Sequence, residues 1–150
     1  MRGLIWCIGV FIAFPAWGCR CLEPTVADAY EAARLVALVR VDSTVPGPAG
    51  ERVEARAVRA WKADIPRTIT FLNDADCDFP LQSGDLYVLY FARGVDGTLS
   101  TGRCKGNRRE PDAMVVLEWL HHHGRPSSVT ATRAPSSALE ARDATPRDPP

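Results

Sequence analysis

Hydrophobic and polar positions divide the chain into three parts. Residues 4–14 form an almost unbroken apolar run, residues 19–123 alternate between short apolar stretches and clusters of turn-forming residues, and residues 124–150 contain no aromatic side chain. Apolar stretches of about four to eight residues, bounded by Gly, Pro, Asp or Ser, are typical of strands rather than of long helices. The pattern therefore predicts a mostly β domain between two segments of other kinds.

The first part has the features of a signal peptide. Arg2 supplies a positive charge, the apolar run follows, and the small residues Ala16 and Gly18 stand at the two cleavage-recognition positions. The run is much shorter than the roughly 20 residues that a membrane span needs, so we expect no membrane span. We expect residues 1–18 to be removed, leaving a secreted or periplasmic protein that begins at Cys19. A buried N-terminal helix is one alternative, and a lipid anchor on the thiol of Cys19 is another.

The middle part predicts two short helices and five strands. Thr25 has the character of a helix N-cap, with Asp28 at the capping-box position. The strands are predicted at residues 35–41, 52–62, 67–73, 86–92 and 98–101, and the second helix at residues 111–120. Five strands with flanking helices indicate a mainly β fold, a five-stranded OB-like Greek-key barrel.

The second predicted strand changes phase along its length. Val53, Ala55 and Ala57 share one face, and Val58 and Ala60 then take over on the opposite parity. An extra residue in one strand of a pair produces this change, because it moves all following side chains to the other face. We therefore predict a β-bulge or a sharp coil of the strand here.

The second helix and the tail that follows it differ sharply in composition. Pro111 suits the first helical position, and Met114, Leu117 and Leu120 have the spacing of core residues. Residues 124–150 are dominated by Pro, Ser, Ala, Thr and Arg, and such a segment cannot bury enough apolar surface to offset the entropy lost on ordering. We expect this tail to be disordered.

Four cysteines remain once Cys7 leaves with the signal peptide: Cys19, Cys21, Cys77 and Cys104. An even count in an exported chain indicates two disulfide bonds, and sequence alone allows three pairings. Pairing Cys19 with Cys21 would strain a very short loop, so the two long-range pairings remain open. Disulfides that close loops as long as those of the two long-range pairings stabilise a domain by roughly 4 kcal/mol each in the chain-entropy model. Because two close Cys-x-x-Cys pairs are missing, we expect no zinc site.

Other clusters of reactive side chains favour neither a metal nor an enzyme. The three histidines at residues 121–123 would point in different directions from a helix end. Asp74, Asp76 and Asp78 are interrupted by Cys77 and lack the glycine and the glutamate of a calcium loop. A cysteine nucleophile would need a free thiol beside a histidine, whereas all four cysteines are expected to be bridged. We therefore expect no catalytic residues, no metal and no cofactor.

The net charge of the chain is close to zero and does not indicate a particular kind of partner. Without residues 1–18 the chain has 17 basic and 18 acidic residues, so we expect no nucleic-acid partner. The run around Cys104 contains the four basic residues Arg103, Lys105, Arg108 and Arg109. Such a cluster either meets an acidic partner or forms an ordinary solvated loop.

These features together resemble the netrin-like module, in particular the tissue inhibitors of metalloproteinases (TIMPs) and their bacterial relatives. The resemblance covers about residues 19–120. It rests on Cys-x-Cys at the expected mature N-terminus, the first buried strand, the sequence Val58-Arg59-Ala60-Trp61-Lys62, the mid-chain Cys77, the strand Leu86-Tyr87-Val88-Leu89-Tyr90, and Cys104 before a helix.

The resemblance implies an OB-like barrel in which Cys19 pairs with Cys77 and Cys21 with Cys104. It also implies that the α-amine and carbonyl of Cys19 chelate the catalytic zinc of a protease while residue 20 enters the specificity pocket. The animal inhibitors have a small hydroxyl residue where this chain has Arg20, and their third N-terminal-domain disulfide and entire C-terminal domain are missing here.

We therefore expect a secreted, disulfide-stabilised binding module rather than an enzyme. Its partner would be an extracellular protease or another extracellular protein. Cys19, Arg20 and Cys21 are the candidate protease-contact residues. Metalloproteinase inhibition and a lipoprotein anchored at Cys19 remain the alternative functions.

Overall fold

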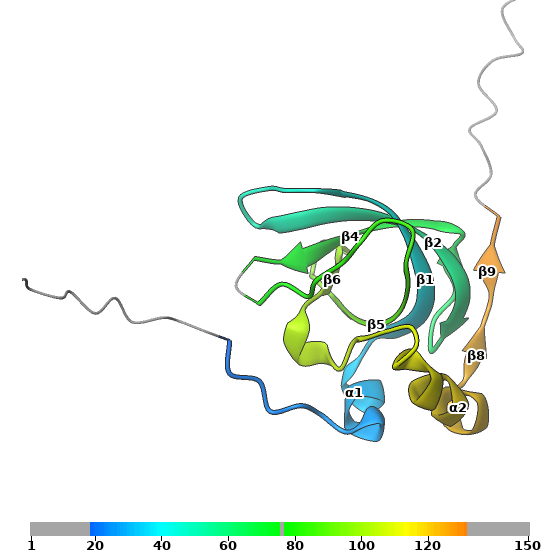
Figure 1. The fold of residues 1–150 in the computed structure, drawn as a ribbon. Coiled ribbons are helices and arrows are strands. Elements are labelled where there is room, and N and C mark those ends of the chain that lie inside the picture. The colour runs from blue at the N-terminus through cyan, green and yellow to red at the C-terminus, as the bar shows by residue number, and fades with distance from the viewer. Residues whose placement is uncertain (1–18, 76, 132–150) are drawn as a thin grey trace, which may run out of the picture.

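The computed structural model describes residues 19–75 and 77–131, and the expected signal peptide, Asp76 and residues 132–150 lie outside the described residues. A curved sheet closes on itself as a barrel, with two helices packed under one end (Figure 1). The elements are, in chain order, α1 (Val26–Ala32), β1 (Leu35–Val45), β2 (Gly50–Trp61), β3 (Ile65–Pro66), β4 (Thr68–Asp74), β5 (Leu86–Arg93), β6 (Leu99–Thr101), the 3₁₀ turn η1 (Arg103–Lys105), β7 (Arg108–Arg109), α2 (Ala113–His123), β8 (Pro126–Ser127) and β9 (Val129–Thr130).

Five strands form the barrel wall. β1 pairs antiparallel with β2, β2 antiparallel with β4, β4 parallel with β6, and β6 antiparallel with β5, which closes the ring against β1. This is the strand order of an OB-like Greek-key barrel. The predicted fold class, a mainly β barrel with short flanking helices and disulfide links, is confirmed.

The change of phase predicted in β2 is present. The register between β1 and β2 shifts so that Val58 is an extra residue in the ladder, between Ala57 and Arg59. Ala60 is fully buried, whereas Val58 is 57% exposed. The extra residue itself bulges outward, and only the residues after it change face.

Apolar side chains form two layers. The first fills the barrel, and its largest fully buried members are Leu35, Val39, Val41, Val53, Phe71, Tyr87, Leu89 and Phe91. The second lies between the barrel and the helices and contains Ala29, Tyr30, Ala33, Val36, Trp61, Val88, Tyr90, Ala113, Val116 and Leu120. β5 contributes to both layers, so both of its faces are buried, which explains its continuous apolar sequence.

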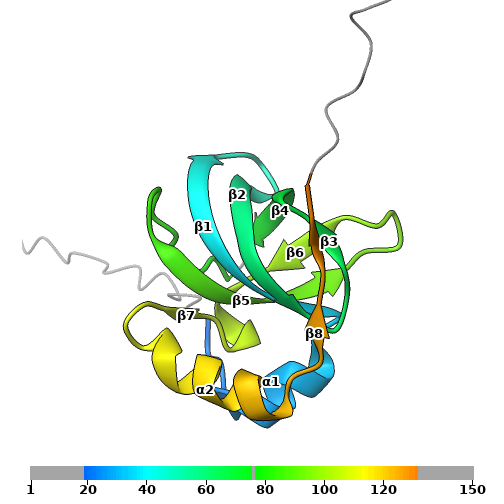
Figure 2. The same ribbon diagram turned by 90° about the vertical axis from the view of Figure 1, so that its right-hand side faces the viewer.

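The two helices lie side by side below the barrel, as Figure 2 shows. Thr25 is the N-cap of α1 as predicted, since its hydroxyl oxygen accepts a hydrogen bond from the backbone N–H of Asp28 at 3.2 Å. At the other end of α1, Lys62 Nζ donates to the carbonyl oxygens of Tyr30 and Ala33, each at 2.6 Å. A cation at these carbonyls is favourable because they carry the negative end of the helix dipole.

The second helix begins later and ends later than predicted. It starts at Ala113 rather than Pro111 and continues through His123. Its buried residues are Ala113, Val116 and Leu120, whereas Met114 is 58% exposed and not part of the core. The short side chains of Ala113 and Val116 face the second layer, and this places Met114 on the outer side of the helix.

The predicted boundary of the disordered tail was too early. β8 pairs with β2 through Ser127 and Pro126, and β9 runs parallel to β3. Residues 124–131 therefore have a defined structure, because unpaired strand edges supply backbone hydrogen bonds even to a segment with few apolar side chains. Residues 132–150, the rest of the predicted tail, lie outside the described residues.

Candidate functional site

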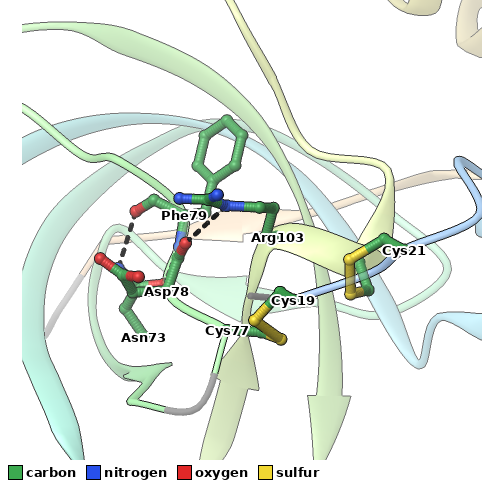
Figure 3. Close-up of a disulfide and its surroundings, with 8 residues drawn as sticks. Cys19, Cys21, Asn73, Cys77, Asp78, Phe79 and Arg103 are labelled. Atoms are coloured by element: carbon green, nitrogen blue, oxygen red, sulfur yellow. Dashed lines mark hydrogen bonds between the residues drawn. A yellow bond between two sulfur atoms is a disulfide. The ribbon is translucent and has the colours of Figure 1, made fainter. Parts of the chain in front are cut away.

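Two disulfides attach the start of the described chain to two loops of the barrel. Cys19 is bonded to Cys77, 58 residues away, and Cys21 to Cys104, 83 residues away. This is the pairing that the resemblance implies. The two bridges lie next to each other (Figure 3), and the sulfur atoms of Cys21, Cys77 and Cys104 are all within 4.8 Å of one another.

The loop that contains Cys77 is held in place by a buried asparagine. Asn73, at the end of β4, is fully buried. Its Nδ2 donates to the carbonyl oxygen of Phe79 at 2.8 Å (Figure 3). The Nδ2 also donates to Glu51 Oε2 at 3.0 Å, and the Oδ1 accepts from the N–H of Phe79 at 3.0 Å. One side chain thus satisfies both backbone groups of Phe79, whose described neighbours in the loop lie outside the strand ladders.

A second buried asparagine holds the turn that contains Cys104. Asn107 is 2% exposed. Its Oδ1 accepts from the backbone N–H of Tyr90 at 2.9 Å, and its Nδ2 donates to the carbonyl oxygen of Gly102 at 3.0 Å and to the hydroxyl oxygen of Thr101 at 2.9 Å. The Thr101 hydroxyl in turn donates to the carbonyl oxygen of Tyr90 at 2.8 Å. The turn η1 is therefore fixed to the middle of β5.

The two cysteine loops are also bonded to each other. The backbone N–H of Arg103 donates to the carbonyl oxygen of Cys77 at 2.7 Å, and Arg103 Nε donates to the carbonyl oxygen of Asp78 at 3.2 Å. The two loops come closest at Gly102, where an added Cβ would lie 2.9 Å from the carbonyl oxygen of Cys77. Together the loops form one platform under the N-terminal segment.

Residues 19–23 lie on this platform, and we call them the contact edge. Cys19 and Cys21 are partly buried, whereas Arg20 is exposed and Leu22 is 97% exposed. Glu23 forms an ion pair with Arg108. The disulfides therefore hold a short segment in which the cationic Arg20 and the apolar Leu22 face solvent.

The basic cluster predicted around Cys104 does not form one positive surface. Arg109 pairs with Asp85 at 2.7 Å, and Arg108 pairs with the contact edge. Arg108 also opposes the effect of burial on the nearby Tyr90 hydroxyl, but burial prevails and raises the pKa of Tyr90 to about 12. Two of the four basic residues thus serve local ion pairs rather than a shared partner site.

The histidines at residues 121–123 are exposed on the last turn of α2. The ring of His123 stacks on Trp119 with ring centroids 4.9 Å apart, and its Nδ1 lies 3.1 Å from the Trp119 carbonyl oxygen. Among the described residues, one group of potential metal ligands is close enough to share an ion: Cys21, Cys77 and Cys104. Their sulfur atoms already form disulfides.

No protein-family model matches this chain, and no curated protein matches it. Within the described ranges, no helix has the length and apolar character needed to cross a membrane. Disulfide bonds form in oxidising compartments such as the periplasm and the extracellular space, and two of them in a small domain are compatible with either location.

Proposed function

We propose that this chain is an exported netrin/TIMP-like binding module that contacts an extracellular protein through its contact edge. The observation that carries the proposal is the double attachment of residues 19–23 to loops that two buried asparagines hold. A segment that is already ordered loses little conformational entropy on binding, so rigid anchoring favours affinity. Arg20 and Leu22 offer a charge and an apolar side chain, which suits a partner surface with an acidic group beside an apolar pocket.

The test compares two variants of the exported protein in cross-linking to a mixture of extracellular proteins. Replacing Arg20→Ala together with Leu22→Ser should abolish the specific cross-links. The control is Val95→Ser, which removes an equally exposed apolar side chain from the turn between β5 and β6. Loss of the same cross-links in the control, or their persistence in the double variant, would show that the contact edge is not the binding surface.

Inhibition of a metalloproteinase is the second candidate function. In this function the mature chain begins at Cys19, and its α-amine and carbonyl oxygen bind the open coordination position of a catalytic zinc. An α-amine has an ordinary pKa near 8, so it loses its proton readily beside a metal. Because a buried guanidinium without a partner is costly, Arg20 restricts the target to proteases with an acidic specificity pocket.

A panel of metalloproteinases tests this candidate with a control that changes the N-terminus alone. The chain that begins at Cys19 should inhibit a protease with an acidic pocket, and a chain that retains Gly18 should not, because the amide then blocks the zinc-binding nitrogen. Equal inhibition by both forms would exclude zinc chelation by Cys19. Intact-mass analysis of the exported protein separately tests the lipid-anchor alternative, which requires the same sulfur that the disulfide to Cys77 uses.

A further inference from the structure

One edge of β4 is only partly covered by other strands. β2 pairs with β4 along its whole length, whereas β6 pairs with it only at Leu72 and Asn73. The N–H of Arg67, just before β4, donates to the carbonyl oxygen of Thr130 in β9 at 2.7 Å, on the side of β4 that faces β2. On the opposite edge, residues 68–71 have no strand partner within the described part of the chain.

The backbone groups of Thr68 and Thr70 point toward this open edge. The N–H of Ala57 in β2 donates to the carbonyl oxygen of Arg67 at 2.7 Å. Bonds in an antiparallel ladder alternate from residue to residue, so the register assigns the odd-numbered residues of β4 to β2. The N–H and C=O groups of the even-numbered residues therefore face away from β2, where an added strand would bond to them.

A cavity of about 640 Å³ lies along the same edge. Its lining includes Thr68, Ile69, Thr70, Phe71 and Leu99. The volume is within the range of about 300–1,000 Å³ that is usual for ligand-binding sites. A groove with an apolar lining and a row of free backbone groups suits an extended peptide better than a compact ligand.

Charge around the groove favours an acidic occupant. Arg52 and Arg93 both line the cavity and are exposed, and neither forms an ion pair with another described residue. Asp64 is the acidic residue in the lining. The lining therefore carries an excess of positive charge, and its two guanidinium groups are available to carboxylates of a partner.

We propose that this groove binds an extended acidic segment of a partner protein, which adds a strand to the open edge of β4 and pairs its carboxylates with Arg52 and Arg93. The residues that line the groove do not overlap with the contact edge or with either cysteine loop. The proposal therefore describes a second binding site, and it stands or fails independently of the proposed function.

Fluorescence anisotropy with two labelled hexapeptides tests the proposal on the full exported chain. One peptide alternates Glu and Val, and the other alternates Lys and Val. The acidic peptide should bind and the basic one should not. Arg52→Glu and Arg93→Glu should each weaken binding by about tenfold or more, and added salt should weaken it further. Arg59→Glu is the matched control, since Arg59 lies on β2 outside the groove lining, and it should leave binding unchanged.

Amide exchange locates the peptide. Saturation with the acidic peptide should slow hydrogen exchange at Thr68 and Thr70 more than at Ile69 and Phe71, which already bond to β2. Failure of the full chain to bind the acidic peptide, equal binding of the basic one, or equal weakening by Arg59→Glu would each overturn the proposal.

The competing occupant is the chain's own C-terminal segment, because the last described residue, Ala131, follows Thr130, which pairs with Pro66 of the groove lining. A variant that ends at Ala131 should bind the peptide as the full chain does. Binding only after this truncation would assign the groove to residues 132–150 and overturn the assignment to a partner.

Discussion

Tyr87 and Tyr90 are both buried on β5, but their hydroxyl groups have different surroundings. The Tyr87 hydroxyl oxygen accepts from the N–H of Gln82 at 2.9 Å, and the group lies 3.4 Å from Asp85 Oδ2. The Tyr90 hydroxyl is buried with no hydrogen-bond partner among the described residues. A buried polar group without a partner costs about 1–3 kcal/mol.

Removing the two hydroxyls should therefore have opposite effects. Tyr90→Phe should raise the free energy of unfolding by about 1 kcal/mol, since it deletes an unsatisfied group, whereas Tyr87→Phe should lower it by about 1 kcal/mol. Urea denaturation of both variants measures the difference. A loss of stability in Tyr90→Phe comparable to that in Tyr87→Phe would mean that the Tyr90 hydroxyl has a partner after all.

Alkaline pH tests the same residue in another way. Burial raises the pKa of Tyr90 from 10.0 to about 12, so the folded state keeps a proton that the unfolded state releases. The contribution of Tyr90 protonation to the free energy of unfolding is therefore fully present below about pH 10, and it is lost as the pH rises toward about 12. Denaturation over this range should show a smaller loss of stability in Tyr90→Phe than in the parent protein. Equal pH dependence of the two proteins would contradict the raised pKa.

At the level of elements, each disulfide depends on one asparagine. Asn73 holds the Cys77 loop, and Asn107 holds the Cys104 turn. Truncating either side chain leaves several backbone groups without a partner, and should lower the free energy of unfolding by about 2–3 kcal/mol.

The pattern of disulfide reduction distinguishes the two asparagines. In Asn73→Ala the bridge from Cys19 to Cys77 should react faster with a mild reductant, and in Asn107→Ala the bridge from Cys21 to Cys104 should do so. Mass spectrometry of alkylated intermediates reads out each bridge. Equal acceleration of both bridges in each variant would show that the loops act as one unit rather than separately.

The elements that could be predicted from sequence are those with a strong period or a specific cap. The N-cap at Thr25, the bulge at Val58 and the continuous apolar strand β5 each leave a local signature. The asparagines and the two-residue strands β8 and β9 do not. An asparagine looks the same in sequence whether it solvates a turn or fixes a loop, and a strand of two residues is too short to show alternation.

The contact edge itself was recognisable only as a cysteine pattern. The loops to which it is bonded are distant in sequence. The disulfide pairing was therefore predicted from the resemblance to a known module and not from the residues alone. The groove along β4 left no signal, because a missing strand partner is a property of topology and not of any residue in β4.

At the level of the whole molecule, the chain after α2 closes the side of the barrel. β8 pairs with the end of β2 next to Trp61, and β9 lies along β3 next to Ile65. Both of these side chains are nearly fully buried. Removing the segment would uncover part of them, and each large apolar side chain contributes about 1.5–3 kcal/mol when fully buried.

Two truncations test this role. A chain that ends at Ala131 should keep its free energy of unfolding, whereas a chain that ends at His123 should lose about 2–4 kcal/mol. Urea denaturation followed by tryptophan fluorescence measures both. An equal free energy of unfolding in the two truncated chains would mean that β8 and β9 do not stabilise the barrel.

The long sequence separation of the two disulfides has a consequence for how the protein is made. A ribosome produces Cys19 and Cys21 first, yet their partners follow 58 and 83 residues later. The contact edge therefore cannot be completed until nearly the entire barrel has been synthesised and folded around it. A chain interrupted before Cys104 cannot form the bridge to Cys21, so both disulfides hold the contact edge only in chains that extend at least to Cys104.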